Sequence, residues 1–145
     1  MAKGPITGMT AADFDRIEKK LPLRVYTARI GYQGEDALDI SRKSATVGQF
    51  MAPTWFLLEP FLKKRGAGGL TTEDWVEYTA GYLGEMRTSY RTHRDQWDAL
   101  LARGTATLLC YCVLPNQCHR TLCAKLILIK LGAIYLGERQ GVLPL

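Results

Sequence analysis

Apolar residues recur along the chain at strand spacing in four stretches. Residues 24–30 alternate polar and apolar side chains and stop at Gly31, which predicts a strand. Residues 105–113 form a continuous apolar run of strand length, as in the buried centre of a parallel sheet. Shorter apolar pulses predict a short strand at residues 37–40 and a final strand at residues 133–136. The first and second of these stretches are the strongest strand signals.

Helical spacing accounts for most of the chain between these strands. Thr10, followed three positions later by Asp13, forms a weak capping box and predicts a helix over residues 10–21. Pro53 suits the first turn of a second helix, which ends in a basic turn and a glycine stop at Gly66. A short, weakly periodic segment separates the early strands from this second helix.

A longer helical pattern follows, capped by Thr71 or Thr72. It predicts one long helix or two in series. The apolar stripe consists of Trp75, Tyr78, Tyr82, Met86, Tyr90, Trp97, Leu100 and Leu101. Gly81 and Gly84 interrupt it at a cost of about 1 kcal/mol each relative to alanine, which ordinary close packing explains most simply. A last, almost wholly apolar helix is expected over residues 122–131.

The order of these elements predicts the fold class. Strands that alternate with helices indicate a small three-layer, Rossmann-like α/β domain, with a mostly parallel central sheet and helices on both faces. We expect a single domain over residues 1–145, made of an N-terminal helical extension at 1–22 and an α/β core at 23–138. The last strand, loop, helix and strand form a right-handed crossover unit.

Composition excludes several classes of protein. With 47% hydrophobic and 23% charged residues, the chain is neither a disordered tail nor a linker. It has no apolar run near the roughly 20 residues of a membrane span, and its start lacks a signal peptide, so we expect a cytoplasmic protein. The net charge of +5 favours an anionic partner. Because the basic residues are spread out, a small molecule is favoured over nucleic acid.

All four cysteines cluster in one segment: Cys110, Cys112, Cys118 and Cys123. We expect no disulfide framework there, because the flanking elements are apolar and the protein is expected in the cytoplasm. Cys110 and Cys112 point to the same face of a strand and are held too far apart to bond to each other. Buried structural cysteine is the simplest interpretation, and three kinds of chemistry compete with it.

The first turn of the last helix carries Cys118, His119 and Arg120, where free backbone N–H groups favour an anion. Arg120 and His119 could hold a phosphate or carboxylate. Cys118 could instead act as a nucleophilic thiolate, although the Cys-x5-Arg pattern of protein phosphatases is absent. Cys110, Cys112, Cys118 and His119 are suitable zinc ligands, but their spacing is not that of paired Cys-x2-Cys knuckles.

These residues resemble a known family. Leu108-Leu109-Cys110-Tyr111-Cys112 running into Cys118-His119-Arg120 resembles the domain-of-unknown-function 488 (DUF488) family, whose hallmark is the Cys-His-Arg turn. Val25-Tyr26-Thr27 resembles the first strand of the family, and Asp39-Ile40-Ser41-Arg42 resembles its pair of Asp and Arg. In the family these two residues more often stand two positions apart, whereas here they stand three apart. The resemblance covers residues 24–138. It implies a small α/β sheet and one pocket shared by Asp39, Arg42 and the Cys-His-Arg turn, but no reaction.

We therefore expect a pocket at this turn that binds or sequesters a phosphorylated, nucleotide-like small molecule. The expected ligand-binding residues are Tyr26, Asp39, Ser41, Arg42, Cys112, Cys118, His119 and Arg120. Arg120 should contact a bound phosphate or Asp39. No cofactor and no metal are expected, with zinc as the minority alternative.

Two alternative functions stay open. One is an enzyme that acts on a nucleotide or nucleoside through Cys118, His119 or Asp39. The other is a nucleic-acid or protein interaction module. Similar proteins look frequent among phage genes, so a role in phage–host conflict is a further hypothesis.

Overall fold

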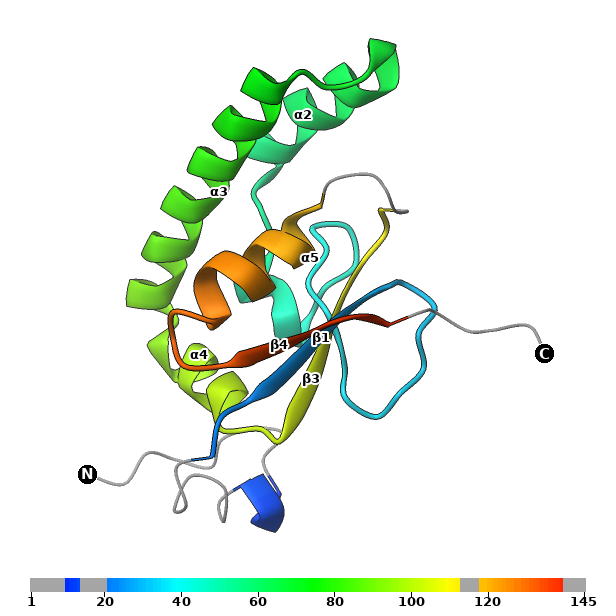
Figure 1. Cartoon of the computed structure of the whole chain (residues 1–145). Coiled ribbons are helices and arrows are strands. Elements are labelled where there is room, and N and C mark those ends of the chain that lie inside the picture. Colours follow the sequence, from blue (N-terminus) through cyan, green and yellow to red (C-terminus); the bar gives the residue numbers. More distant parts are fainter. Residues whose placement is uncertain (1–9, 14–20, 113–117, 140–145) are drawn as a thin grey trace, which may run out of the picture.

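The computed structural model describes residues 10–13, 21–112 and 118–139 (Figure 1). Within this part of the chain, four strands form one sheet: β1 (Arg24–Arg29), β2 (Ala37–Asp39), β3 (Thr105–Cys110) and β4 (Ile134–Arg139). Their order is β2-β3-β1-β4, and every neighbouring pair is parallel. The protein is a small Rossmann-like α/β domain, which confirms the predicted fold class.

Two strands end at positions that the apolar pattern does not predict. β3 stops at Cys110 rather than at Val113, because Tyr111 leaves the ladder and places its hydroxyl 2.8 Å from Ser44 Oγ. Val113 itself lies outside the described residues. β4 extends beyond residue 136, because the chain up to Arg139 continues to pair with β1. Strand ends are thus set by contacts that the local pattern does not contain.

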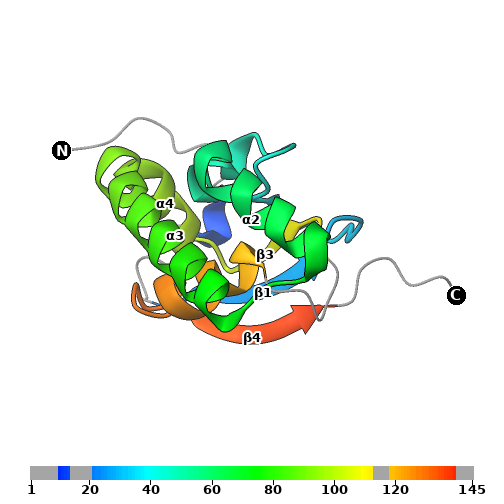
Figure 2. The same ribbon diagram turned by 90° about the horizontal axis from the view of Figure 1, so that it is seen from above.

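Helices α2 and α3 follow one another and lie side by side (Figure 2). α2 (Trp55–Gly68) runs two residues past the predicted stop, and Gly69, with φ of 93°, ends it in a conformation that glycine adopts readily. α3 (Thr72–Thr92) begins at a capping box between Thr71 and Asp74. A Cβ on Gly81 would lie 2.6 Å from Leu57 Cδ1, so this glycine lets the two helices approach closely.

The long aromatic pattern is two helices in series, since α4 (Arg94–Leu101) starts after a break at His93. Trp97 is fully buried, and its indole Nε1 donates to Ser89 Oγ at 3.1 Å. Most residues of the predicted apolar stripe belong to a single apolar cluster that also contains residues of the sheet. Its fully or largely buried members on these helices include Tyr78, Tyr82, Met86, Trp97 and Leu100. The 3-10 helix η1 (Val47–Met51) packs against the same cluster.

The last helix begins at His119, so its first turn carries His119 and Arg120 as predicted, and Cys118 directly precedes it. α5 (His119–Leu122) passes directly into π-helical turns, η2 (Cys123–Leu128). Leu122, Ala124 and Leu128 are buried on the cluster that contains strand residues of β1 and β3. The chain then enters β4, which pairs with β1 and not with β3. The buried start of this helix therefore meets the end of β3.

The N-terminal capping box is present: Thr10 N donates to the Asp13 carboxylate at 2.9 Å, and Asp13 N to Thr10 Oγ1 at 3.2 Å. Residues 11–13 are helical. The rest of that predicted helix up to residue 20, and the predicted loop at 114–117, lie outside the described residues. Among the helices that the structure describes, none has the length and apolar character needed to cross a membrane.

Candidate functional site

The candidate site lies at the edge of the sheet where the parallel strands end. Asp39 ends β2, Cys110 ends β3, and the register sets Asp39 beside Leu109. Cys118 and His119 reach the same edge from the start of α5, whose closest strands are β3 and β1. Open parallel sheets commonly bind ligands at this edge. The structure therefore brings several of the predicted site residues together.

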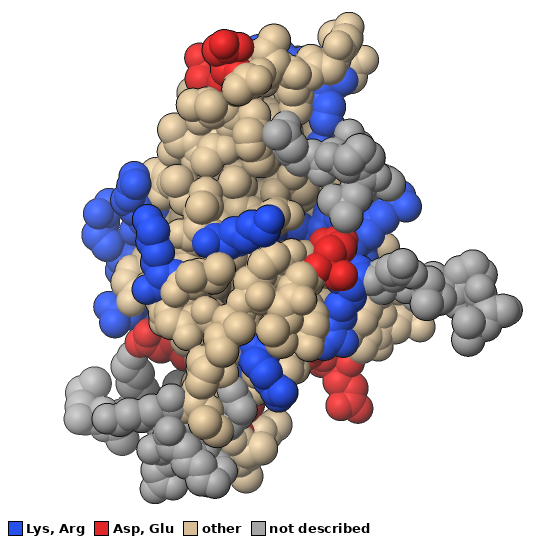
Figure 3. Space-filling view, in the orientation of Figure 1, with Lys and Arg blue, Asp and Glu red and all other residues tan. Residues whose placement is uncertain are grey.

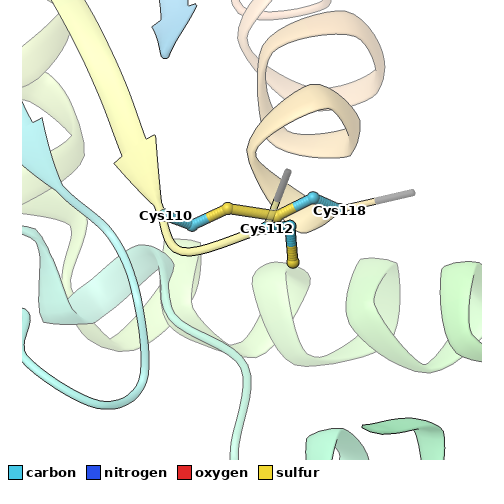
Figure 4. A group of neighbouring side chains, drawn as sticks. All are labelled: Cys110, Cys112 and Cys118. Atoms are coloured by element: carbon cyan, nitrogen blue, oxygen red, sulfur yellow. A yellow bond between two sulfur atoms is a disulfide. The ribbon is translucent and has the colours of Figure 1, made fainter. Parts of the chain in front are cut away.

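Three sulfur atoms form the centre of this edge. Cys110 and Cys118 are joined by a disulfide, and the Sγ atoms of Cys110, Cys112 and Cys118 lie within 4.8 Å of one another. Figure 4 shows the bonded pair and the Cys112 sulfur turned away from it, towards α3. The expectation of no disulfide is therefore wrong. That expectation rested on the apolar flanking elements and the expected cytoplasmic location, whereas the bond joins the end of β3 to the residue that precedes α5.

His119 is buried and held in one orientation. Its Nε2 donates to the carbonyl oxygen of Ile40 at 2.7 Å. In the neutral ring the other nitrogen, Nδ1, therefore carries no proton, and it lies 3.7 Å from Cys118 Sγ. Burial lowers the pKa of His119 to about 4; the hydrogen bond to Ile40 raises it, Arg120 lowers it, and Asp39 raises it. The imidazole is thus neutral at neutral pH, and the Nδ1 lone pair faces the sulfur of Cys118.

Arg120 is completely buried, and all three guanidinium nitrogens are engaged. Nε and Nη2 donate to the two carboxylate oxygens of Glu138, at 3.2 and 2.9 Å. Nη1 donates at 2.9 Å both to Cys110 Sγ and to the carbonyl oxygen of Cys112. The structure therefore pairs Arg120 with Glu138, and not with Asp39 as the sequence analysis expected. Sequence reasoning missed Glu138 because a single acidic residue after a short apolar strand carries no spacing signal.

Asp39 organises the loop after β2. Its carboxylate accepts from Ser41 N at 2.8 Å and from Ser44 Oγ at 2.5 Å. Ser44 Oγ is also 2.8 Å from the hydroxyl of Tyr111, a partly exposed ring that sequence reasoning missed. Lys43 lies over this ring, 5.3 Å from its centroid.

Two further predicted residues differ in where they lie. Arg42 belongs to the same loop as Asp39 and is partly exposed. Tyr26 belongs to another cluster: the Arg139 guanidinium lies 3.6 Å above its ring, and Arg139 also contacts Tyr32 and Asp36. Arg42 thus lies in the loop that follows Asp39, whereas the contacts of Tyr26 place this ring in a different cluster.

Among the described residues, only the three sulfurs of Cys110, Cys112 and Cys118 form a group that could hold a metal ion. Two of them are bonded to each other. Guanidinium nitrogens also donate to two of them, since Arg120 Nη1 contacts Cys110 Sγ and Arg65 Nη1 lies 3.3 Å from Cys112 Sγ. A cationic neighbour favours a thiolate and disfavours a metal cation. The donor set fits sulfur chemistry better than zinc.

Elsewhere the surface carries a groove of about 310 Å³ between α3 and residues 126–131. Its floor is apolar, and its rim carries Arg87, Arg91 and Lys130. Lys and Arg side chains are numerous on this flank in Figure 3 but also occur elsewhere on the face shown. None of the predicted site residues lines this groove.

The comparisons with known proteins identify one family. Residues 18–131 match a family model described as the active DUF488-N3 subclade. The match spans most of the chain and includes the ends of β2 and β3, the cysteine cluster and the start of α5. No curated protein and no solved structure matched the chain.

Proposed function

Because the chain belongs to the DUF488 family, in its active N3 subclade, we propose that it is a thiol enzyme that acts on an anionic, nucleotide-like small molecule. Cys118 is the nucleophile, and His119 is its base. The observation that carries the proposal is the 3.7 Å approach of His119 Nδ1 to Cys118 Sγ, with the other ring nitrogen fixed by Ile40. A nucleophile, a base and a group that orients the base form the usual arrangement for covalent catalysis.

A pure binding role has less support. Arg120 and His119, the side chains expected to hold a phosphate, are buried and already have partners for their N–H groups. An anionic ligand would find its positive charge at Arg42 and Lys43 in the loop after β2 instead. The exposed ring of Tyr111 offers a face on which a base could stack. Substrate binding and thiol chemistry would then share one edge of the sheet.

The reaction needs the reduced form of the protein. Once Cys118 is free, its proton passes to His119 Nδ1, and the thiolate attacks an electrophilic atom of the substrate. The bond to the leaving group breaks, and the leaving group takes the proton from His119. Water then attacks the thio-linked intermediate and releases Cys118. We propose a cytoplasmic location, where thiol pools keep such a cysteine reduced.

The test is incubation of the full chain with a panel of nucleotides, including ADP-ribose-type molecules, after treatment with a phosphine reductant. We expect a new product by mass spectrometry with the wild type and its loss in Cys118→Ser. Cys123→Ser is the matched control, because burial raises the pKa of this cysteine to about 12 and it takes no part in the sulfur cluster. It should keep full turnover.

Each other outcome decides between functions. Nucleotides bound but recovered intact after denaturation would indicate a binding protein and overturn the enzymatic proposal. Salt-dependent retardation of an oligonucleotide, with no small molecule bound or converted, would indicate a nucleic-acid module instead.

A further inference from the structure

Cys112 differs from the other cysteines of the chain in being both free and partly exposed. Cys110 and Cys118 are joined in a disulfide, and Cys123 is free but completely buried. Arg65 Nη1 lies 3.3 Å from Cys112 Sγ, which is a charge-assisted donor to a thiolate. A partly exposed thiol with a cationic donor is the environment of a reactive cysteine.

The disulfide next to Cys112 is within reach of this thiol. All three sulfurs lie within 4.8 Å of one another, and a rotation of the Cys112 side chain, whose sulfur points towards α3, would direct it at Cys118 Sγ. The sulfur that would leave, Cys110 Sγ, already accepts a hydrogen bond from Arg120 Nη1 at 2.9 Å. A guanidinium nitrogen therefore lies against both the attacking sulfur and the leaving sulfur. A leaving thiolate that is stabilised in this way departs faster.

We propose that Cys112 is a thiol-exchange site through which a low-molecular-weight thiol reduces the Cys110–Cys118 disulfide. In the first step the Cys112 thiolate, its proton lost to solvent, attacks Cys118 Sγ. A Cys112–Cys118 bond forms, the Cys110–Cys118 bond breaks, and Cys110 leaves as a thiolate.

The external thiol completes the exchange. Its thiolate attacks Cys112 Sγ and expels Cys118, which takes up a proton and leaves a mixed disulfide on Cys112. A second external thiolate attacks the outer sulfur of this mixed disulfide and releases Cys112. In total, one protein disulfide gains two electrons and two protons, and two thiol molecules become one external disulfide. The inference deepens the proposed function, since the product is the free Cys118 on which that function rests.

The test uses the full oxidised chain and reduced glutathione, with free thiols trapped by a maleimide at timed intervals. Peptide mapping should find the glutathione adduct on Cys112. Cys112→Ser should slow the reduction of the Cys110–Cys118 disulfide by about tenfold or more. Cys123→Ser should reduce at the wild-type rate. Thermal unfolding checks that both variants fold, and Cys112→Ala replaces the serine variant if it does not.

Two results would overturn the inference: an equal rate of reduction without Cys112, or an adduct found first on Cys110 or Cys118. Turnover after phosphine reduction is measured in parallel, since it bypasses Cys112. If phosphine-reduced Cys112→Ser turns over substrate, and glutathione reduces its disulfide at the wild-type rate, only this inference is overturned. A clear exchange defect without turnover of any nucleotide by the wild type removes only the proposed enzyme.

Discussion

Two arginines at the same edge of the sheet lie in contrasting surroundings. The side chain of Arg120 is 1% exposed and forks onto Glu138, whereas that of Arg139 is 34% exposed and lies 3.7 Å from Asp36. Every nitrogen of Arg120 has an acceptor, while Arg139 Nε has none among the described residues. Similar ion pairs can therefore differ in role. The buried one determines the structure of the site, and the exposed one covers an aromatic ring.

The largest expected effect is that of Arg120→Ala. It leaves Glu138 without its partner beneath the sulfur cluster and should cost about 3–5 kcal/mol of unfolding free energy. Arg120→Lys keeps the charge but cannot form the fork, so its cost should be intermediate. Urea unfolding in the absence of any ligand measures both. A cost below about 1 kcal/mol for the alanine variant would contradict the structural role.

The next largest effect is a pH dependence of the free energy of unfolding, which comes from His119, the buried neighbour of Arg120. Because the folded pKa of His119 is lowered to about 4 from 6.5, the unfolded chain binds a proton that the folded chain does not. This difference in proton binding contributes up to about 3 kcal/mol to the free energy of unfolding. The contribution is complete above pH 6.5 and is lost as the pH falls towards 4.

Unfolding curves between these pH values measure this loss in the wild type. His119→Asn should remove it, although the variant loses some stability at every pH. His93 is exposed and is the other histidine of the chain, so His93→Asn is the matched control and should keep the full dependence. A wild-type curve that stays flat over this range argues against a neutral, buried His119.

A smaller effect is expected from Thr27→Val. Thr27 Oγ1 donates to Glu138 Oε1 at 2.6 Å and accepts from the Tyr135 hydroxyl at 2.7 Å, which joins these groups to Arg120. Valine has the same shape but leaves both partners without this hydrogen bond, at a cost of about 1–2 kcal/mol. Thermal unfolding compares it with Thr88→Val, an exposed position on α3 that should change little. Equal melting temperatures for the two variants would show that Glu138 does not depend on Thr27.

The smallest effect is expected from Arg139→Ala. The ion pair with Asp36, whose two side chains are only partly exposed, the hydrogen bond to the Tyr32 hydroxyl and the contact with the Tyr26 ring together should contribute about 1 kcal/mol, and salt should weaken the ionic part. Urea unfolding at low and high salt measures the difference. If Arg139→Ala costs as much as Arg120→Ala, exposure does not separate the two arginines.

The fold follows from local patterns to a large extent. The apolar run that contains β3 and the alternation in β1 depend on residues that are neighbours in sequence, so strand type and the parallel sheet could be predicted. The ends could not. β3 stops because Tyr111 bonds to Ser44, and β4 continues because its last residues find a place beside β1. Both contacts join residues that are distant in sequence.

The site could be predicted where its residues are adjacent. Cys118, His119 and Arg120 stand in one turn, and the sequence locates them at the end of the strongest strand. Their partners could not be predicted, because Glu138 and Ile40 reach this turn only through the strand order. The disulfide follows the same rule, since it depends on how the start of α5 docks against the end of β3.

The strand order also sets the timing of folding. β1 pairs with β3 and β4 alone, and its first residue, Arg24, lies opposite Thr105 and Ile134. At a synthesis rate of about 5–20 residues per second, β1 therefore waits roughly 4–16 s on the ribosome before its first partner strand is made. During this interval both of its edges are open to other chains, so nascent-chain aggregation should begin at β1. Contacts so distant in sequence also favour slow folding after release, with β4 closing the sheet last.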